Sequence, residues 1–414
     1  MVMIWIITIL TIHFVVDRFL NYLNLRSMKP DLPASLKEIF SPVEYRKSQE
    51  YHRVHGRLDA ITAAVMFVLT VGMFLFKGFG ALDQLVRSVT ENPIGMALLF
   101  FGILGVISEI IGLPFEWYSH FVIEKRYDFN RMTLKTFILD KLKSWMLTLI
   151  IGIPLFSLVI WFYIKTGTSF WWIAWLLITV VSLFFTFFYS TLIVPLFNKQ
   201  EPLEPGELRD AIESMAAQSG FQLKRIYKIN GSKRSTKANA YFTGFGRYRR
   251  VVLYDTLIDD LNKEQITAVL AHEIGHYKKH HILKGMAGSV LQTGLILFLF
   301  SLVINNPGLA HAAGATQPSF HIGAIVFAVL YSPVAWFTGW GVNLLSRKRE
   351  YQADCYAQKS GFGRDLADAL VRLSKKNLSN LTPHPAYVSV YYSHPPLLSR
   401  LENLKQTRIK HINK

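Results

Sequence analysis

The sequence predicts a predominantly α-helical, polytopic membrane protein with seven transmembrane helices and a small cytoplasmic α+β domain. The first observation is composition: 51% of the 414 residues are hydrophobic and only 18% are charged, whereas roughly 25% of an ordinary soluble protein is charged. The second is that the apolar residues come in runs of about 20, the length needed to cross a bilayer. The third is that one long polar segment, residues 197–282, separates the fifth run from the sixth.

The first run is interpreted as a retained span. It has no basic residues at its start and no small-residue cleavage site before Asp17, so it does not have the pattern of a removed signal peptide. The fifth run is long enough to tilt in the bilayer. The expected spans are residues 3–16, 58–76, 94–114, 145–164, 170–196, 283–304 and 322–345.

The charges of the loops alternate along the chain. Lysine and arginine are numerous in residues 17–57, 115–144 and 197–282 and after Ser346, they are sparse in the two short loops between, and residues 305–321 contain none. Because cytoplasmic loops carry the excess of basic residues, we expect a cell-membrane protein with its N-terminus outside and its C-terminus in the cytoplasm. The net charge of +17 is assigned to these loops and not to a nucleic-acid partner, for which no recognised module is present.

The polar segment predicts a small folded domain. Short apolar stretches, bounded by Asn230-Gly231 and by a turn at Gly244-Phe245-Gly246, predict strands. We expect them to form a small antiparallel sheet whose edge could pair with an extended peptide. Asn262, with Gln265 three residues later, is a helix start signal. The expected elements are a helix over 202–221, strands over 225–229, 239–243 and 250–254, and a helix over 263–280 that runs straight into the sixth span.

The last of these helices contains an H-E-x-x-H pattern at residues 272–276. Residues four apart share a face of a helix, so His272 and His276 can bind one metal ion. Glu273 can take a proton from a water that the metal polarises, and this water attacks a carbonyl in metal-assisted hydrolysis. A catalytic zinc site needs a third protein ligand and one open position. The helix is expected to pack through a stripe formed by Ile266, Leu270 and Ile274, roughly opposite the histidines.

The two spans after the pattern supply a candidate third ligand. They form a hairpin with arms of nearly equal length, which returns Glu350 to about the depth of His276. The single cysteine, Cys355, excludes a cysteine-based metal site. Glu350 is therefore expected to bind one Zn²⁺ per chain together with the two histidines. Asp354, four residues later on the same face, can accept the free N–H of a ligand histidine and fix its tautomer.

These residues resemble those of the type I CAAX prenyl endopeptidase family, integral-membrane zinc metallopeptidases related to the HtpX-like proteases. The resemblance covers essentially the whole chain, and seven spans fit this branch better than the shorter HtpX branch. The expected substrates are membrane-associated proteins of the CAAX type, prenylated or not. The lack of eukaryotic targeting features and the compact outer loop are interpreted as signs of a bacterial member, whose natural substrate could be a different one. The other segments that carry the resemblance are residues 113–130, Asn239-Ala240-Tyr241, and Tyr392-Ser393-His394-Pro395-Pro396 followed by Arg400.

The resemblance implies a fold and roles for individual residues. The seven helices would enclose a chamber in the membrane, with the zinc site of a zincin-type protease domain near its cytoplasmic end. Asn239, with Ala240 and Tyr241, would bind the substrate backbone. His394 would hydrogen-bond the tetrahedral intermediate in an oxyanion role, and Arg400 would support the site electrostatically. The expected partners are the lipid bilayer and a peptide or protein substrate, lipidated or not.

Two other functions stay open on the sequence alone. A quality-control protease would use the same chemistry on non-prenylated or stalled membrane proteins. A catalytically inactive transporter or scaffold would have no need of Glu273. The expected organisation is helices one to five with their loops over residues 1–196, the metallopeptidase domain over 197–282, helices six and seven over 283–346, and the C-terminal part of the protease domain, with the third ligand, over 347–414.

Overall fold

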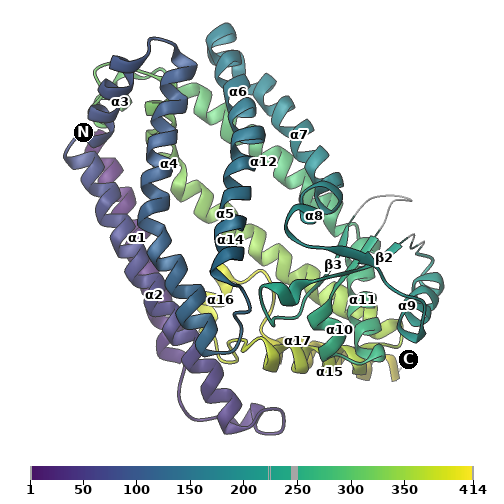
Figure 1. The fold of residues 1–414 in the computed structure, drawn as a ribbon. Coiled ribbons are helices and arrows are strands. Elements are labelled where there is room, and N and C mark those ends of the chain that lie inside the picture. The colour runs from purple at the N-terminus through teal and green to yellow at the C-terminus, as the bar shows by residue number, and fades with distance from the viewer. Residues whose placement is uncertain (1, 222, 224, 244–249, 413–414) are drawn as a thin grey trace.

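The computed structural model describes residues 2–221, 223, 225–243 and 250–412. Long helices stand side by side, and a small sheet with shorter helices lies at one end of them (Figure 1). Within these described ranges, six helical segments are long and apolar enough to cross a membrane. One of these, residues 134–197, turns back at Gly167–Ser169, so that α6 and α7 lie side by side and the described residues form seven helices able to cross a membrane. They are α1 (Val2–Ser27), α2 (Pro42–Leu75), α4 (Pro93–Tyr118), α5 (Leu134–Leu147) continued through η3 (Thr148–Gly152) into α6 (Ile153–Thr166), α7 (Phe170–Leu192), α12 (His281–Val303) and α14 (Phe320–Lys359).

The predicted polytopic helical fold is confirmed, but several helices extend beyond the predicted spans. Hydropathy marks only the part of a helix that lies in the bilayer, whereas capping marks where the helix begins. In α2, a capping box at Ser41 and Glu44 starts the helix well before residue 58. This polar extension binds the loop near the C-terminus, because the Ser48 hydroxyl donates to the Ser379 carbonyl (2.6 Å).

The membrane helices contact one another along narrow strips. In five of the six crossing segments, less than a fifth of the most apolar window is buried inside the protein. Such low burial is typical of a bundle that surrounds a space, because helices in a closely packed bundle bury their inner faces. An apolar cavity of about 710 Å³ lies between α4 and the η3–α6 segment, where Gly102, Gly105 and Gly152 leave room in the wall. These observations agree with the predicted chamber.

The end of the bundle farthest from the sheet is more ordered than the sequence indicated (Figure 1). Residues expected to be a plain loop form α3 (Gly78–Val89), which packs beside the short helix α13 (Pro307–Ala312) and its following turn. A Cβ on Gly80 would lie 2.0 Å from the Gly314 carbonyl oxygen, so only glycine permits this approach. The buried Asp83 carboxylate accepts hydrogen bonds from His321 (2.6 Å) and Arg87 (2.9 Å), which holds α3 against α14.

The sheet has four strands in the order β1-β2-β4-β3, and its central pair is parallel. The predicted antiparallel sheet is therefore wrong for this pair, while the β3–β4 pair is antiparallel. The apolar run Val251-Val252-Leu253 is fully buried and takes a central position, so β2 joins on its free side. The predicted turn at residues 244–246 lies outside the described residues. The strands are β1 (Gln200–Pro202), β2 (Arg225–Ile229), β3 (Ala240–Thr243) and β4 (Arg250–Tyr254).

The helices around the sheet share one core with the C-terminal segment. Ile212, Leu253, Leu270 and Leu404 are buried in a single cluster that joins the polar segment to the C-terminal part of the chain. The expected helix over 202–221 is shorter, because Pro202 belongs to β1 and the helix begins only at Glu207. The shorter helices are α8 (Val194–Phe197), α9 (Glu207–Gln218), α10 (Asp255–Asp260), α11 (Lys263–Lys278), α15 (Gly363–Lys376), α16 (Pro385–Tyr391) and α17 (Leu397–Ile412).

The helix with the H-E-x-x-H pattern begins as predicted but ends earlier. Asn262 and Gln265 form the expected capping box, and the stripe of Ile266, Leu270 and Ile274 is buried. The prediction that the helix runs straight into the sixth span is wrong. His280 lies between α11 and α12 with φ +57°, a left-handed conformation that interrupts a helix.

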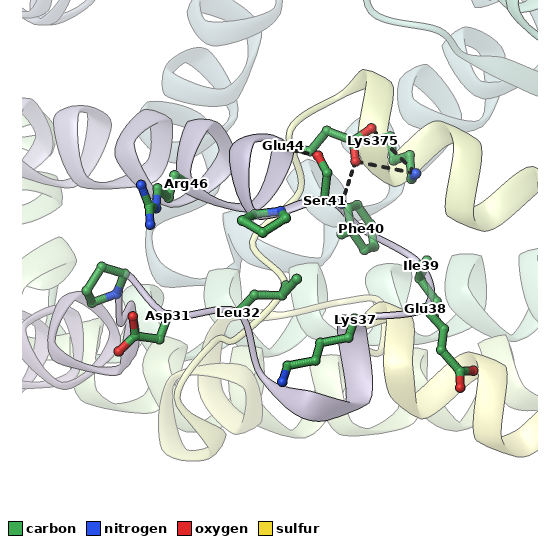
Figure 2. Close-up of a pocket in the computed structure, with 12 residues that line it drawn as sticks. Asp31, Leu32, Lys37, Glu38, Ile39, Phe40, Ser41, Glu44, Arg46 and Lys375 are labelled. Atoms are coloured by element: carbon green, nitrogen blue, oxygen red, sulfur yellow. Dashed lines mark hydrogen bonds and ion pairs between the residues drawn. The ribbon is translucent and has the colours of Figure 1, made fainter.

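An open notch of about 730 Å³ lies beside the start of α2, between that helix and α15 (Figure 2). Glu44 accepts from the Ser41 backbone N–H (2.8 Å) and pairs with Lys375 of α15 (3.4 Å). Residues of both signs line the notch, and none of the predicted site residues is among them. It is therefore not a candidate for the reaction site.

Candidate metal centre

Three side chains from two helices converge on one point. α11 supplies His272 and His276, whose Nε2 atoms lie 3.1 Å apart. α14 supplies Glu350, with Oε2 at 3.5 Å from His272 Nε2 and Oε1 at 3.2 Å from His276 Nε2. His272 and Glu350 are buried, and His276 is half-buried. Within the described part of the chain, this is the one group of three or more such side chains whose spacing suits a metal ion.

The spacing fits a tetrahedral Zn²⁺ ion. With bonds of about 2.0–2.1 Å, adjacent ligands of a tetrahedral zinc lie roughly 3.3 Å apart, and the three distances here are 3.1, 3.2 and 3.5 Å. The Nε2 atoms of His272 and His276 face each other beside the buried Glu350 carboxylate. A cation bound by all three groups would satisfy both nitrogens at once. The donor set of two histidines and one glutamate leaves a fourth position for substrate or water, which is typical of a catalytic site.

Small residues allow α11 and α14 to approach closely enough to form this site. A Cβ on Gly275 would lie 3.0 Å from both Ala353 Cα and Tyr356 Cβ, and Ala353 is fully buried. A larger residue at either position would push the two helices apart. The sequence thus places its smallest side chains at the crossing that brings Glu350 to His272.

Asp354 and Arg400 support His272 from the side opposite the metal. His272 Nδ1 donates to Asp354 Oδ1 (2.8 Å), which leaves Nε2 free for a metal. Arg400, from α17, donates two hydrogen bonds to the same carboxylate, from Nε to Oδ2 (3.0 Å) and from Nη2 to Oδ1 (2.6 Å). Burial alone would lower the pKa of His272, but the hydrogen bonds with Asp354 and Glu350 outweigh it and raise that pKa to about 9. Because a metal ligand must be neutral, a bound cation displaces this proton.

His281 contacts the other ligand histidine, and Gln352 contacts His281; the sequence patterns predict neither contact. In the sequence, His281 is a polar residue just before the sixth span, with no pattern that links it to the metal. Its Nδ1 lies 3.1 Å from His276 Nδ1, and its Nε2 lies 2.8 Å from Gln352 Oε1. No helical periodicity relates residue 281 to residue 276 across the break at His280, so only the fold reveals this contact.

The expected catalytic residues come from two places in the chain, α11 and the segment before α17. Glu273 is half-buried, and among the described residues none donates a hydrogen bond to its carboxylate, which is thus free to accept a proton. His394 lies before α17 with Nδ1 at 2.9 Å from Glu350 Oε2, and its side chain is 66% exposed. Arg347 donates to the carbonyls of Val388 and Ser389 (both 2.8 Å) at the end of α16, which fixes the segment that leads to His394.

The expected substrate-binding segment lies at the edge of the sheet. Asn239 is exposed directly before β3, and its side-chain oxygen accepts from the Ala240 N–H (2.8 Å). Ala240 packs on the core that contains α11, whereas the Tyr241 side chain packs on the opposite face with Val194 and Ile229. The structure therefore does not bring the Tyr241 side chain to the metal ligands, and only the backbone of this residue can serve an extended peptide.

A polar network holds this segment to the membrane helices. Lys237, two residues before Asn239, donates to Tyr51 of α2 (2.8 Å) and pairs with Glu124 (3.1 Å). Glu124 ends the π-helical turn η2 (Ser119–Glu124) that follows α4, and it pairs with His55 (3.1 Å). The position of the edge strand is thus coupled to the first turns of α2 and to the π-helical turn that follows α4.

Known proteins match the chain over nearly its whole length. Residues 21–199 match the N-terminal region of CAAX prenyl proteases, with five membrane helices, and residues 202–408 match peptidase family M48. The CAAX prenyl protease 1 homolog of Arabidopsis thaliana is 35% identical, covering 96% of this chain and 96% of that protein. The CAAX prenyl protease 1 of Saccharomyces cerevisiae is also 35% identical, covering 95% of this chain and 92% of that protein. The crystal structure of S. mikatae Ste24p matches with a TM-score of 0.92 and 33% identity, covering 98% of this chain and 99% of that one.

Proposed function

The chain belongs to peptidase family M48 and has the N-terminal membrane helices of the CAAX prenyl proteases, and we propose from this that it cleaves prenylated CAAX-type substrates with one Zn²⁺ ion. It is a multi-pass membrane metalloendopeptidase, and its substrates are peptides or proteins. The alternative of an inactive transporter or scaffold is therefore set aside. The observation that carries the zinc proposal is the set of three donor atoms, from His272, His276 and Glu350, at tetrahedral spacing.

The reaction proposed for this site is hydrolysis by an activated water. When bound, Zn²⁺ would supply Lewis acidity that polarises the attacking water and the peptide carbonyl. Glu273 then accepts the proton of the water and later donates it to the nitrogen of the leaving amine. His394 lies beside Glu350, where its exposed ring can donate to the oxyanion of the tetrahedral intermediate.

Positioning of the substrate and of the ligands is assigned to the surrounding residues. Asn239 and the backbone of Ala240 and Tyr241 would bind the substrate as an added strand on the edge of the sheet. β3 is the last strand of the sheet, so its outer edge is the side on which such pairing can occur. Arg400 and Asp354 act through His272, since they hold its tautomer and orientation.

The division of the chain into four parts is also proposed here. Residues 1–196 and 283–346 supply the membrane helices, and residues 197–282 and 347–414 supply the protease domain. One core joins Leu253 and Leu270 to Leu366 and Leu404. This core supports the idea that residues 197–282 and 347–414 fold together.

A lipid on the substrate is supported by two observations. The relatives named above are described as CAAX prenyl proteases, and the apolar cavity of about 710 Å³ between α4 and α6 could take a hydrocarbon chain. We expect a farnesylated CAAX peptide to be cleaved at least about tenfold more efficiently, as kcat/KM, than the same peptide without the lipid, since burial of each CH₂ contributes roughly 0.8 kcal/mol. Equal cleavage of both peptides would instead favour a quality-control protease.

The orientation proposed for the protein places the N-terminus outside and the metal centre in the cytoplasm. It is supported by the basic residues of the loops at the end of the bundle that carries the sheet, and by the lack of Lys and Arg in residues 305–321. A membrane-impermeant reagent should label a cysteine introduced at Ser319 in intact cells. Labelling only after lysis would reverse the assignment.

A further inference from the structure

We propose that His281 and Gln352 act as a positioning pair for the metal ligand His276, by fixing its tautomer through a chain of neutral hydrogen bonds. The inference rests on the metal site proposed above and adds two residues to it. His281 is 5% exposed, and it is the first residue of α12. Its ring lies edge-on to that of His276, with the centroids 5.1 Å apart and the planes at 74°.

Only one arrangement of protons gives every nitrogen in this chain of hydrogen bonds a suitable partner. His276 Nε2 faces His272 Nε2 and Glu350 Oε1, so it must be bare to bind a metal, and its Nδ1 then carries the proton. The Nδ1 atoms of His276 and His281 lie 3.1 Å apart, and two N–H groups cannot face each other at that distance. His281 Nδ1 is therefore the acceptor, and its Nε2 carries the proton.

Gln352 completes the chain by choosing the tautomer of His281. Its Oε1 lies 2.8 Å from His281 Nε2, and a carbonyl oxygen can only accept. Without this acceptor, His281 could place its proton on Nδ1, opposite the N–H of His276. Gln352 comes from α14, the helix that also supplies Glu350 to the metal and Asp354 to His272, so one helix fixes all three ligands.

The break between α11 and α12 brings His281 into place. In an uninterrupted α-helix, residues five apart lie about 140° apart around the axis, so residue 281 would point away from residue 276. His280 instead adopts φ +57°, and α12 restarts in a direction that returns His281 to the His276 ring. Non-glycine residues adopt this conformation at a cost, and it persists where the surroundings fix it.

The two ligand histidines thus have different outer partners. His272 donates to a carboxylate that is held by Arg400, whereas His276 donates to a neutral imidazole that is held by an amide. An outer partner of this kind orients the ligand ring, and its loss typically weakens metal binding by about 10–100-fold.

The test measures Zn²⁺ affinity of the full-length protein in detergent by competition with a chelator, without substrate. His281→Phe keeps the ring but removes the acceptor, and we expect it to weaken Zn²⁺ binding by about 10–100-fold. His281→Gln restores an acceptor and should recover most of the affinity. Gln352→Leu should weaken binding less, and it should have no further effect in the His281→Phe background, because the chain is already broken there.

His311→Phe is the matched control, because it makes the same substitution at an exposed histidine of α13, a helix that supplies no metal ligand. It should bind Zn²⁺ as the unmodified protein does. Unchanged affinity in His281→Phe, equal losses in His281→Phe and His281→Gln, or additive losses in the double variant would each overturn the inference in favour of packing alone. If the unmodified protein binds no Zn²⁺, the metal site itself fails, which is a distinguishable result.

Discussion

Glu273→Gln should abolish peptide cleavage while the protein keeps its metal. The substitution preserves the size of the side chain but removes the group that accepts the proton of the attacking water. General acid–base catalysis contributes about 10²–10⁴-fold, so the rate should fall by at least that factor. Glu273 is half-buried and is not one of the three converging ligands, so metal content should stay at one ion per chain. The measurements are cleavage of a farnesylated peptide and metal analysis of the same preparation.

Glu264→Gln is the matched control for this prediction. Glu264 lies in the first turn of the same helix and is exposed, so its loss should leave cleavage unchanged. If pure Glu273→Gln protein cleaves at the normal rate, Glu273 is not the base.

Glu350→Ala should remove both the metal and the activity. Glu350 is the one ligand that comes from α14, and its carboxylate contacts both histidines. Without it only two protein ligands remain, which is fewer than a catalytic zinc site uses. We expect metal affinity to fall by more than the roughly 10–100-fold typical of an outer-shell partner. Dialysed protein should then contain no stoichiometric metal and should show no cleavage.

Glu402→Ala provides the control, since Glu402 is an exposed carboxylate on α17, two residues after Arg400. That variant should retain metal and cleavage. Retention of one metal ion per chain by Glu350→Ala would contradict the proposed ligand set and would require another side chain in its place.

Much of the fold could be predicted because two strong signals in the sequence are local. Runs of apolar residues long enough to cross a bilayer indicate helices directly, and the capping residues Asn262 and Gln265 mark the start of α11. Strand pairing was predicted less well. The parallel β2–β4 pair depends on which strand buries both faces, and Val251-Val252-Leu253 takes the centre only when α11 covers it.

The residues of the candidate site also fall into those that local patterns in the sequence predict and those that they do not. The spacing of His272 and His276, the neighbouring Glu273, and the equal arms of the hairpin that ends at Glu350 are properties of the sequence, because helix geometry alone relates them. The same holds for Asp354, four residues after Glu350 on one face. The resemblance to a known family added His394 and Arg400, which no periodicity connects to the other residues.

The sequence by itself determined that the chain is a multi-pass helical protein with an H-E-x-x-H helix and a carboxylate partner, because hydropathy and helical period are set by near neighbours. The tertiary structure alone decided how the ligands are held. The left-handed turn at His280 and the close crossing at Gly275 bring His281 to His276 and Gln352 to His281. Such contacts depend on the path of the backbone between helices, which distant packing fixes and no local pattern records.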